Sequence, residues 1–394
     1  MFSDTLFRDG LETSALGDRK LNLLVWCWGR RGGSVRLTHD LVKAMRERDD
    51  VELSVSLSRQ SELFEETSEF GLPGLHVDTY NGVGSALVNS LRLPALRAKM
   101  AQLVRERRIQ VVLCVMRHPW SSLVFPAFRD AGARVLMKLH DAAPHPGEGY
   151  PFWQQHLAMD LAATDGLVVL SDHVRRAALA QHAYPANRIW TIPHAGFVFD
   201  PPARRETPRT LPTDRPPRLL FFGRLLEYKG LDLLAKAFRI LRGRRDVELR
   251  IVGTGRAALV GEFHGKPGVT LDLRWVPERE IGPILNDADL IVAPYREASQ
   301  SGVIPAAYGL GLPVVAMPVG GLVEQIEHGR TGLIAGQTNA ESFAATVEML
   351  LDNPALYRTC SEGALNASRT TLDADRVAAR LCTIAREVAA LPRR

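Results

Sequence analysis

Two cations in one short loop are the first residues of this chain that can do chemistry. Residues 219–238 read LLFFGRLLEYKGLDLLAKAF: an apolar strand, a loop with Arg224 and Lys229, and an amphipathic helix beginning near Gly230. An anion at this loop would meet two cationic side chains and the positive end of a helix. The loop predicts a phosphate-binding site, against the alternative that both cations are only solvated or paired.

A second stretch of the C-terminal half can bind an anion through its backbone. Residues 294–316 run from a strand end through small polar residues into a helix with Pro305 near its first turn, where proline is tolerated. The N–H groups of Ser301, Gly302 and Val303 would lack intrahelical partners and would point at a ligand. Two such helix starts on adjacent strands can converge on one diphosphate.

In the N-terminal half, glycines follow the first predicted strand. Gly32 and Gly33 form a flexible loop, and Ser34 can cap the next helix, whose apolar positions include Leu37 and Leu41. Glycines allow a backbone to approach a phosphate or a sugar closely. A purely structural turn between strand and helix is the commoner use of such a loop.

Polar residues leave another strand in the segment KLHDAAPHPGEG, residues 138–149. His140, Asp141 and His145 lie there, where they can bind sugar hydroxyls or move a proton. The alternative is a histidine that only hydrogen-bonds its own loop.

The segment GTGRAA, residues 253–258, supports a different kind of protein. It resembles part of a dinucleotide-binding fingerprint, with Asp272 near the place of a ribose-binding acid. A nicotinamide-dependent dehydrogenase would bind its cofactor at Gly253 and Gly255. Such a protein usually carries the fingerprint at the first strand of its nucleotide domain, whereas here it follows the second.

Short runs of Val, Ile and Leu that alternate with helical stretches must position these residues. The alternation predicts an α/β fold with two doubly wound parallel sheets, whose ligands bind outside the carboxyl ends of the strands. The expected strands are 21–28, 51–57, 74–80, 110–116, 134–140, 166–171, 188–193, 218–222, 247–252, 269–273, 290–294 and 314–317.

The chain of 394 residues exceeds what one core usually supports, so two domains are expected. We place an N-terminal acceptor-binding domain at 1–199, a linker rich in proline and arginine at 200–217, and a donor-binding domain at 218–375. A C-terminal helix follows at 376–394, for which packing back on the N-terminal domain is one option.

The composition limits the partners and the setting. A formal charge of +5 suits an anionic ligand or a membrane surface but falls short of a nucleic-acid-binding profile. Four scattered cysteines without metal-ligand spacing indicate buried, reduced thiols. With neither a signal peptide nor an apolar run of about 18 residues, we expect a cytoplasmic protein.

One helix raises the question of a membrane. Residues 92–108 place Leu93, Met100 and Leu103 on one face, with arginines and lysines around it. Such a helix can lie on an anionic bilayer, whereas a helix that covers a sheet with a solvated basic face is the simpler interpretation.

Taken together, residues 21–380 resemble the retaining GT-B glycosyltransferases of family 4, the glycosyl transferases of group 1. The most specific matches are GRLLEYKG and the long segment GLGLPVVAMPVGGLVEQIEHGRTGLIA. The Gly32–Gly33 loop, His140 and NDADLIVAP also fall where the family has counterparts. The resemblance implies two Rossmann-like domains that face each other across a cleft, with a nucleotide-sugar donor held mainly by the second and an acceptor mainly by the first.

The resemblance also implies roles for single residues. Arg224 and Lys229 would neutralise the departing diphosphate, and His140 would contact the transferred sugar. The remaining donor-site residues would be Gly32, Gly33, Gly223, Gly253, Val276, Ser301, Gly302 and Val303. Asp141 and His145 would bind the acceptor. Neither a metal nor a further cofactor is implied, because the cations are built in and Asp287 and Asp289 lie before a strand.

The chain departs from the family at two glutamates eight positions apart. Alignment on Pro313 puts Ala298 and Ala306 at these places. Glu297 is one residue away from the first place and is a candidate catalytic residue, but nothing evident replaces the second. The SQSG sequence at 299–302 resembles a variant associated with bacterial surface polysaccharides.

The expected activity is transfer of a sugar, from a uridine or guanosine diphosphate sugar for example, to a hydroxyl of a glycan or a lipid-linked glycan. The family's mechanism is a front-face displacement that retains the anomeric configuration. Three alternatives stay open: a sugar-nucleotide epimerase of the same fold, an inactive carbohydrate-binding or scaffold subunit, and the dehydrogenase.

Overall fold

The chain folds into two compact units, which are described separately. The computed structural model describes residues 20–148, 152–197 and 205–392. The C-terminal unit takes residues 194–373 together with the short segment 144–148, and the N-terminal unit takes the rest. The helix at the C-terminal end of the chain thus belongs to the N-terminal unit.

The N-terminal unit is built on a six-stranded parallel sheet with the order β2-β1-β3-β4-β5-β6. Its strands consist of Val, Leu and Ile runs, as expected of strands buried on both faces. The strands are β1 (Leu21–Cys27), β2 (Val51–Leu57), β3 (Val111–Met116), β4 (Arg134–Leu139), β5 (Gly166–Val169) and β6 (Ile189–Thr191).

Helices cover both faces of this sheet. Alternate residues of β1, Leu24 and Trp26, share one apolar cluster with the helices α4, α5 and α6, while the residues between them point to the other face, where α1 packs with α14. The helices are α1 (Gly33–Arg46), α2 (Phe64–Ser68), α3 (Val83–Ser90), α4 (Leu93–Glu106), α5 (Ser121–Asp130), α6 (Trp153–Ala162), α7 (Asp172–His182) and α14 (Ala374–Ala390), with the 3-10 turn η2 (Ala186–Arg188).

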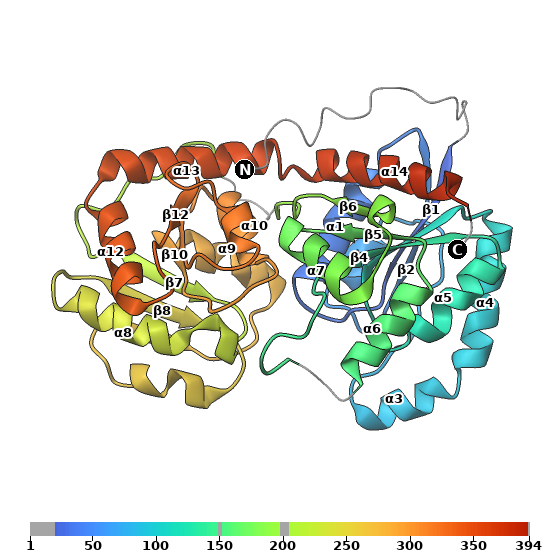
Figure 1. The fold of residues 1–394 in the computed structure, drawn as a ribbon, viewed down its shortest axis with the longest axis horizontal. Coiled ribbons are helices and arrows are strands. Elements are labelled where there is room, and N and C mark those ends of the chain that lie inside the picture. The colour runs from blue at the N-terminus through green and yellow to red at the C-terminus, as the bar shows by residue number, and fades with distance from the viewer. Residues whose placement is uncertain (1–19, 149–151, 198–204, 393–394) are drawn as a thin grey trace. The chain divides into compact units, whose positions relative to one another are not determined.

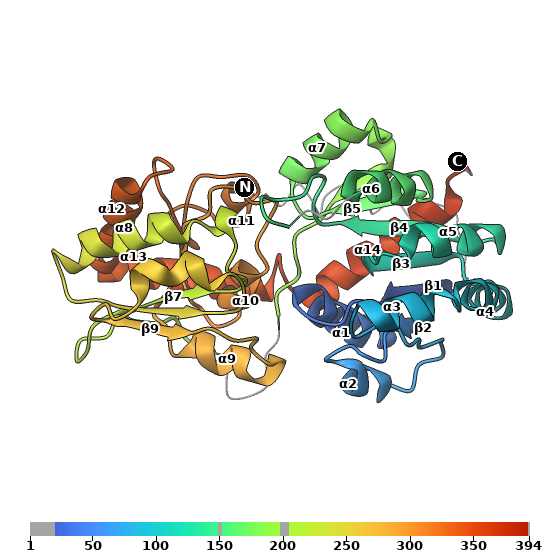
Figure 2. The same ribbon diagram turned by 90° about the horizontal axis from the view of Figure 1, so that it is seen from below.

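The C-terminal unit has its own six-stranded parallel sheet, in the order β12-β11-β10-β7-β8-β9. In Figure 2, β7 and β9 lie between α8 on one side and α9 on the other. The strands are β7 (Arg218–Phe222), β8 (Glu248–Val252), β9 (Val269–Asp272), β10 (Leu290–Ala293), β11 (Val314–Ala316) and β12 (Gly332–Ile334). The helices are α8 (Leu231–Arg242), α9 (Glu278–Asn286), α10 (Val303–Tyr308), α11 (Leu322–Gln325), α12 (Ala340–Leu351) and α13 (Pro354–Arg369), with the 3-10 turns η3 (Glu227–Lys229) and η4 (Ala257–Phe263).

Each sheet reverses its strand order once, and this reversal locates a ligand site. In the C-terminal unit the reversal falls between β7 and β10, and in the N-terminal unit it falls between β1 and β3. Loops that leave neighbouring strands in opposite directions open a crevice at the carboxyl ends. The two expected doubly wound parallel sheets are confirmed.

Two strand predictions were wrong. Residues 74–80 form no strand, because their backbone pairs with β2 and the residue after it only in isolated bridges, Gly74 with Val55 and Val77 with Ser58. Strand β12 was missed because its three residues, Gly332–Ile334, are too short to give a pattern.

The basic helix of the sequence corresponds to α4, and its apolar side is buried. Leu93, Met100 and Leu103 belong to the core, where α4 packs on α5. This apolar side therefore does not lie on a bilayer, since it is already buried against α5 and the core. Within the described ranges, no helix is both long and apolar enough to cross a membrane. The four cysteines are buried and unbridged, as expected.

Candidate active site

The loops after β7 and β10 touch each other at the strand reversal of the C-terminal unit. Gly230 has φ 69°, and a Cβ at this position would overlap the carbonyl oxygen of Pro294. The Arg296 N–H donates to the Tyr228 carbonyl over 2.7 Å. Only glycine allows this approach and this backbone conformation, which explains the Lys-Gly pair of the sequence motif.

Lys229 lies at the centre of this contact. It closes the 3-10 turn η3 and is only 9% exposed. Its ammonium nitrogen lies 3.7 Å from the centroid of the Tyr295 ring and 5.1 Å from that of Tyr228. Among the residues that the structure describes, no carboxylate pairs with it. The site thus holds a buried cation whose contacts are aromatic faces.

Arg224 does have an anionic partner. Its side chain is 58% exposed and forms an ion pair with Glu148, which is 15% exposed. The Tyr228 hydroxyl also donates to Glu148 Oε1, over 3.4 Å. Glu148 comes from the segment 144–148, which belongs to the C-terminal unit. The guanidinium that was predicted to bind phosphate is therefore paired with a carboxylate in this structure.

The same segment brings His145 to Glu297. His145 Nδ1 lies 2.7 Å from Glu297 Oε1, and Nε2 lies 3.3 Å from the Ser299 hydroxyl. The imidazole stacks on the Tyr228 ring with a centroid distance of 4.5 Å. His145 was predicted to bind the acceptor, whereas the structure places it beside the predicted catalytic Glu297. No local sequence signal could show this contact.

At the start of α10, one of the three backbone N–H groups that were expected to be free for a ligand already has a hydrogen-bond partner. The Ser301 N–H is not an orphan, because it donates to Gln325 Oε1 over 2.7 Å, while the Gln325 amide donates to the Ser301 carbonyl over 3.1 Å. Gly302 is the residue before the helix, and Val303 is its first residue. Sequence reasoning missed Gln325, whose side-chain amide satisfies the Ser301 N–H and carbonyl.

The two alanines that replace the family's glutamates are interior residues. Ala298 is 2% exposed and Ala306 is 5% exposed. The Ala298 carbonyl accepts a hydrogen bond from the Gly321 N–H over 2.9 Å, which fixes the loop. Both side chains are thus packed against the surrounding chain.

The glycines of GTGRAA have a structural role. A Cβ at Gly253 would overlap the Gly223 carbonyl oxygen, and Leu225 N–H donates to the Thr254 carbonyl over 2.8 Å. These contacts extend the β7–β8 pairing beyond the strands, so the fingerprint-like pattern requires no dinucleotide. Val276 lies buried in the loop between β9 and α9.

In the N-terminal unit, Ser34 does not cap α1. Gly32 precedes the helix and its N–H donates to Glu62 Oε1 over 2.8 Å, whereas Ser34 lies inside the first turn. The Ser34 hydroxyl accepts from the ammonium of Lys138, at 3.0 Å. Burial lowers the pKa of Lys138 from its usual 10.5 to about 8. Gly33 is exposed at the start of the helix.

His140 follows β4 in the N-terminal unit. Its Nδ1 lies 2.7 Å from Asp141 Oδ2, and its side chain is 41% exposed. Asp141 orients this imidazole, as a carboxylate beside a histidine commonly does. The structure therefore gathers Arg224, Lys229 and Glu297 in one unit and keeps His140 and Asp141 in the other.

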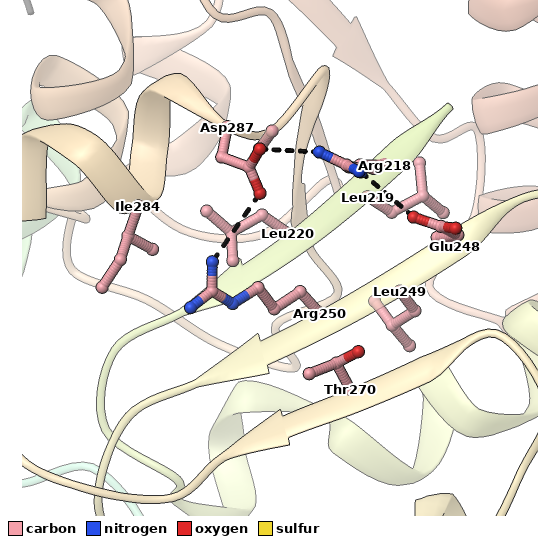
Figure 3. A pocket seen from close by; sticks show the side chains of 10 residues that line it. Arg218, Leu219, Leu220, Glu248, Leu249, Arg250, Thr270, Ile284 and Asp287 are labelled. Carbon is pink, nitrogen blue, oxygen red and sulfur yellow. Dashed lines mark hydrogen bonds and ion pairs between the residues drawn. The ribbon is translucent and has the colours of Figure 1, made fainter. Parts of the chain in front are cut away.

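A pocket of about 240 Å³ lies away from this site, at the amino ends of β7, β8 and β9. Figure 3 shows that ion pairs cross it: Arg218 meets Asp287 at 2.6 Å and Glu248 at 3.1 Å, and Arg250 lies 3.8 Å from Asp287. The two arginines of the pocket are thus paired with its two carboxylates. We therefore interpret the pocket as part of the packing beside α9. Asp287 has a structural partner there.

The two six-stranded parallel sheets and their strand orders correspond to the GT-B fold. The family model described as Glycosyl transferases group 1 matches residues 216–353, and the one described as Glycosyltransferase Family 4 matches residues 31–195. Each half of the chain thus matches a model of a glycosyltransferase domain. These matches argue against the alternative that the protein is a dehydrogenase.

Individual relatives agree with this assignment. The D-inositol 3-phosphate glycosyltransferase of Pseudarthrobacter chlorophenolicus is 37% identical over 146 residues, which are 35% of either chain. The alpha-D-kanosaminyltransferase of Streptomyces kanamyceticus is 28% identical over 235 residues, 56% of this chain and 60% of that one. The chain thus spans about a third of the length of the inositol phosphate relative.

A solved structure shares the fold over nearly the whole chain. Anabaena Alr3699/HepE, in complex with UDP and glucose, superposes with a TM-score of 0.71 at 18% identity, covering 93% of this chain and 100% of that one. At this identity the likeness concerns the fold.

Proposed function

We propose that the protein transfers a sugar from a nucleoside diphosphate sugar to a hydroxyl acceptor. The observation that carries the proposal is Lys229, a buried ammonium at the carboxyl ends of β7 and β10 with aromatic contacts and no carboxylate partner among the described residues. Burying a cation without a counter-ion costs several kcal/mol. A diphosphate at the strand reversal would supply the missing charge.

The neighbouring groups fit the same ligand. Arg224 supplies a second cation, and the N–H groups of Gly302 and Val303 at the start of α10 supply donors. Charge that develops on the leaving diphosphate would be stabilised by groups already in place, which is commonly a large part of catalysis. Glu148 would have to release Arg224 when the donor binds.

The chemistry of the transfer follows from the family. We propose retention at the anomeric carbon through a front-face displacement, in which the leaving phosphate takes the acceptor's proton. His140 would contact the transferred sugar. The cations of the chain would serve in place of a metal, and no cofactor besides the donor is needed.

The relatives suggest which donor and which acceptor to test first. A uridine diphosphate sugar is the first donor to test, because the solved relative from Anabaena holds UDP and glucose. The name of one relative gives inositol 3-phosphate as the acceptor, whereas the name of the kanosaminyltransferase gives only the transferred sugar. From the SQSG segment we propose a glycan or lipid-linked glycan of a bacterial surface polysaccharide as acceptor.

We further propose that the protein works in the cytoplasm, with peripheral contact to anionic membranes through the corner of α3 and α4. Leu91 is 83% exposed and Val88 is 56% exposed, and the outer side of α4 carries Arg97, Lys99 and Arg105. Basic and apolar groups side by side favour an anionic bilayer. Flotation with vesicles of phosphatidylcholine, with and without phosphatidylglycerol, tests this, and absence of binding at low salt would refute it.

The experiment for the function is a thermal-shift screen of uridine, guanosine and adenosine diphosphate sugars, followed by product analysis. A donor at a hundred times its Kd raises the free energy of unfolding by about 2.7 kcal/mol. Release of nucleoside diphosphate together with a new glycoside supports transfer. An epimerised sugar nucleotide supports the epimerase, and binding without turnover over a panel of acceptors supports the scaffold subunit.

A further inference from the structure

Glu297 lies beside the place of the family's first glutamate, and the two neighbouring positions differ in burial. Ala298 points into the interior at 2% exposure, while its carbonyl is held by the Gly321 N–H. The Glu297 carboxylate, by contrast, is reachable, with 48% of its side chain exposed. A carboxylate needed near the donor sugar therefore fits at 297 rather than at 298.

An exposed glutamate has no fixed position by itself. Holding such a long side chain in one rotamer costs conformational entropy. Here the Oε1 atom of Glu297 meets Nδ1 of His145 at 2.7 Å, and the histidine side chain is only 10% exposed. A hydrogen bond from a buried group offsets part of that cost and sets one direction for the carboxylate.

The histidine is itself held on three sides. Its ring stacks on Tyr228 at 4.5 Å with an interplanar angle of 21°, and Nε2 lies 3.3 Å from the Ser299 hydroxyl. When this hydroxyl donates to Nε2, the neutral imidazole carries its proton on Nδ1, facing Glu297. With the protons arranged in this way, the imidazole donates to the Glu297 carboxylate.

A tight turn fixes the backbone of the segment. The Glu148 N–H donates to the His145 carbonyl over 2.9 Å, with Pro146 and Gly147 between them and φ 85° at Gly147. Proline followed by a residue with positive φ is the pattern of a type II turn. The turn sends His145 to Glu297 and Glu148 to Arg224.

We infer that His145 is a positioning residue for Glu297 and thereby for recognition of the transferred sugar. The inference rests on the proposed function, because Glu297 can contact a sugar only if a nucleotide sugar binds beside Lys229. The stacking partner Tyr228 and the phosphate-binding Lys229 are adjacent in η3, so one turn sets the geometry of both ends of the donor. His145 does not touch the phosphates in this arrangement.

The test compares three replacements of His145 in the full-length protein. In His145→Asn the amide nitrogen occupies the place of Nδ1 and can still donate to Glu297. In His145→Gln the amide lies where Nε2 was, and in His145→Ala there is no donor. Binding of UDP alone is measured by calorimetry, and hydrolysis and transfer are measured with the fastest donor among UDP-, GDP- and ADP-glucose.

We expect His145→Ala and His145→Gln to lower kcat by about tenfold to a hundredfold, the loss typical of a misplaced group. UDP affinity should change less than twofold, and His145→Asn should recover most of kcat. The double variant His145→Ala with Glu297→Gln should be no slower than Glu297→Gln alone, since residues that act together are not additive.

Other outcomes overturn the inference. Equal activity of the Ala and Asn variants, full activity of Glu297→Gln, or parallel losses of UDP affinity and kcat would show that the contact is only structural. In each of these cases a Lys229-dependent turnover would leave the proposed function standing. If the unaltered protein neither binds UDP nor releases a nucleoside diphosphate from any donor, the proposed function fails and the inference fails with it.

Discussion

Replacing Lys229 by methionine removes a buried charge while keeping the unbranched stem that packs beside Tyr228 and Tyr295. The ammonium is 9% exposed and lies 3.7 Å from the Tyr295 ring centroid. A phosphate oxygen about 4 Å away, at an effective dielectric constant of about 20, would gain about 4 kcal/mol from this charge. Losses of about 3 kcal/mol are typical of single donors at electrostatic sites, which corresponds to a rate about a hundredfold lower.

Stability should respond differently from activity. The variant loses a cation–π contact of about 2 kcal/mol but no longer buries an uncompensated cation, which costs several kcal/mol. We therefore expect the Tm of the ligand-free protein to stay the same or to rise, while kcat falls about a hundredfold and the thermal shift caused by UDP disappears.

The assay pairs differential scanning calorimetry, with and without UDP, with the release of UDP from a donor sugar. Lys236→Met, on the exposed side of α8, is the matched control and should change neither quantity. If Lys229→Met keeps its rate and its UDP affinity, the ammonium does not bind the diphosphate and the proposed site is wrong.

Three further predictions concern Glu148, Gly230 and Lys138. Glu148→Gln leaves Arg224 without its counter-charge, so we expect UDP to bind about three- to tenfold more tightly in calorimetry. Gly230→Ala introduces a Cβ that overlaps a carbonyl at positive φ, so urea unfolding should show a loss of more than about 2 kcal/mol. Lys138, with a folded pKa of about 8 instead of 10.5, binds its proton more tightly when unfolded, so the free energy of unfolding should rise by about 3 kcal/mol from pH 8 to 10.5.

Each of these has its own control. Glu327→Gln, which removes an exposed carboxylate paired with Arg330, should leave UDP binding unchanged, and weaker binding in the Glu148 variant would contradict the competition. Gly261→Ala has open space around its Cβ and should be close to neutral. Lys138→Met should abolish this rise of the free energy of unfolding with pH. If the pH dependence of the variant is unchanged, the rise comes from other groups.

Local patterns in the sequence were sufficient for the architecture. The alternation of apolar runs and helices predicted two parallel sheets, and the residue pattern placed Arg224 and Lys229 in a loop after a strand, where the structure has them. Both follow from short-range rules, because strand burial and helix starts depend on residues only a few positions apart. The prediction missed strand β12, because three residues are too few to show an alternating pattern. It wrongly assigned a strand to residues 74–80, which form only isolated bridges.

Only the tertiary structure decided which groups meet. His145 and Glu297 are 152 positions apart, Lys138 and Ser34 are 104 apart, and Gln325 and Ser301 are 24 apart. A hydrogen bond between such residues leaves no periodic signal, since its geometry depends on how whole strands and loops pack. The sequence by itself therefore determined the two sheets and the loop after β7 that carries Arg224 and Lys229, while the packing of segment 144–148 against η3 decided how Glu297 and Arg224 are held.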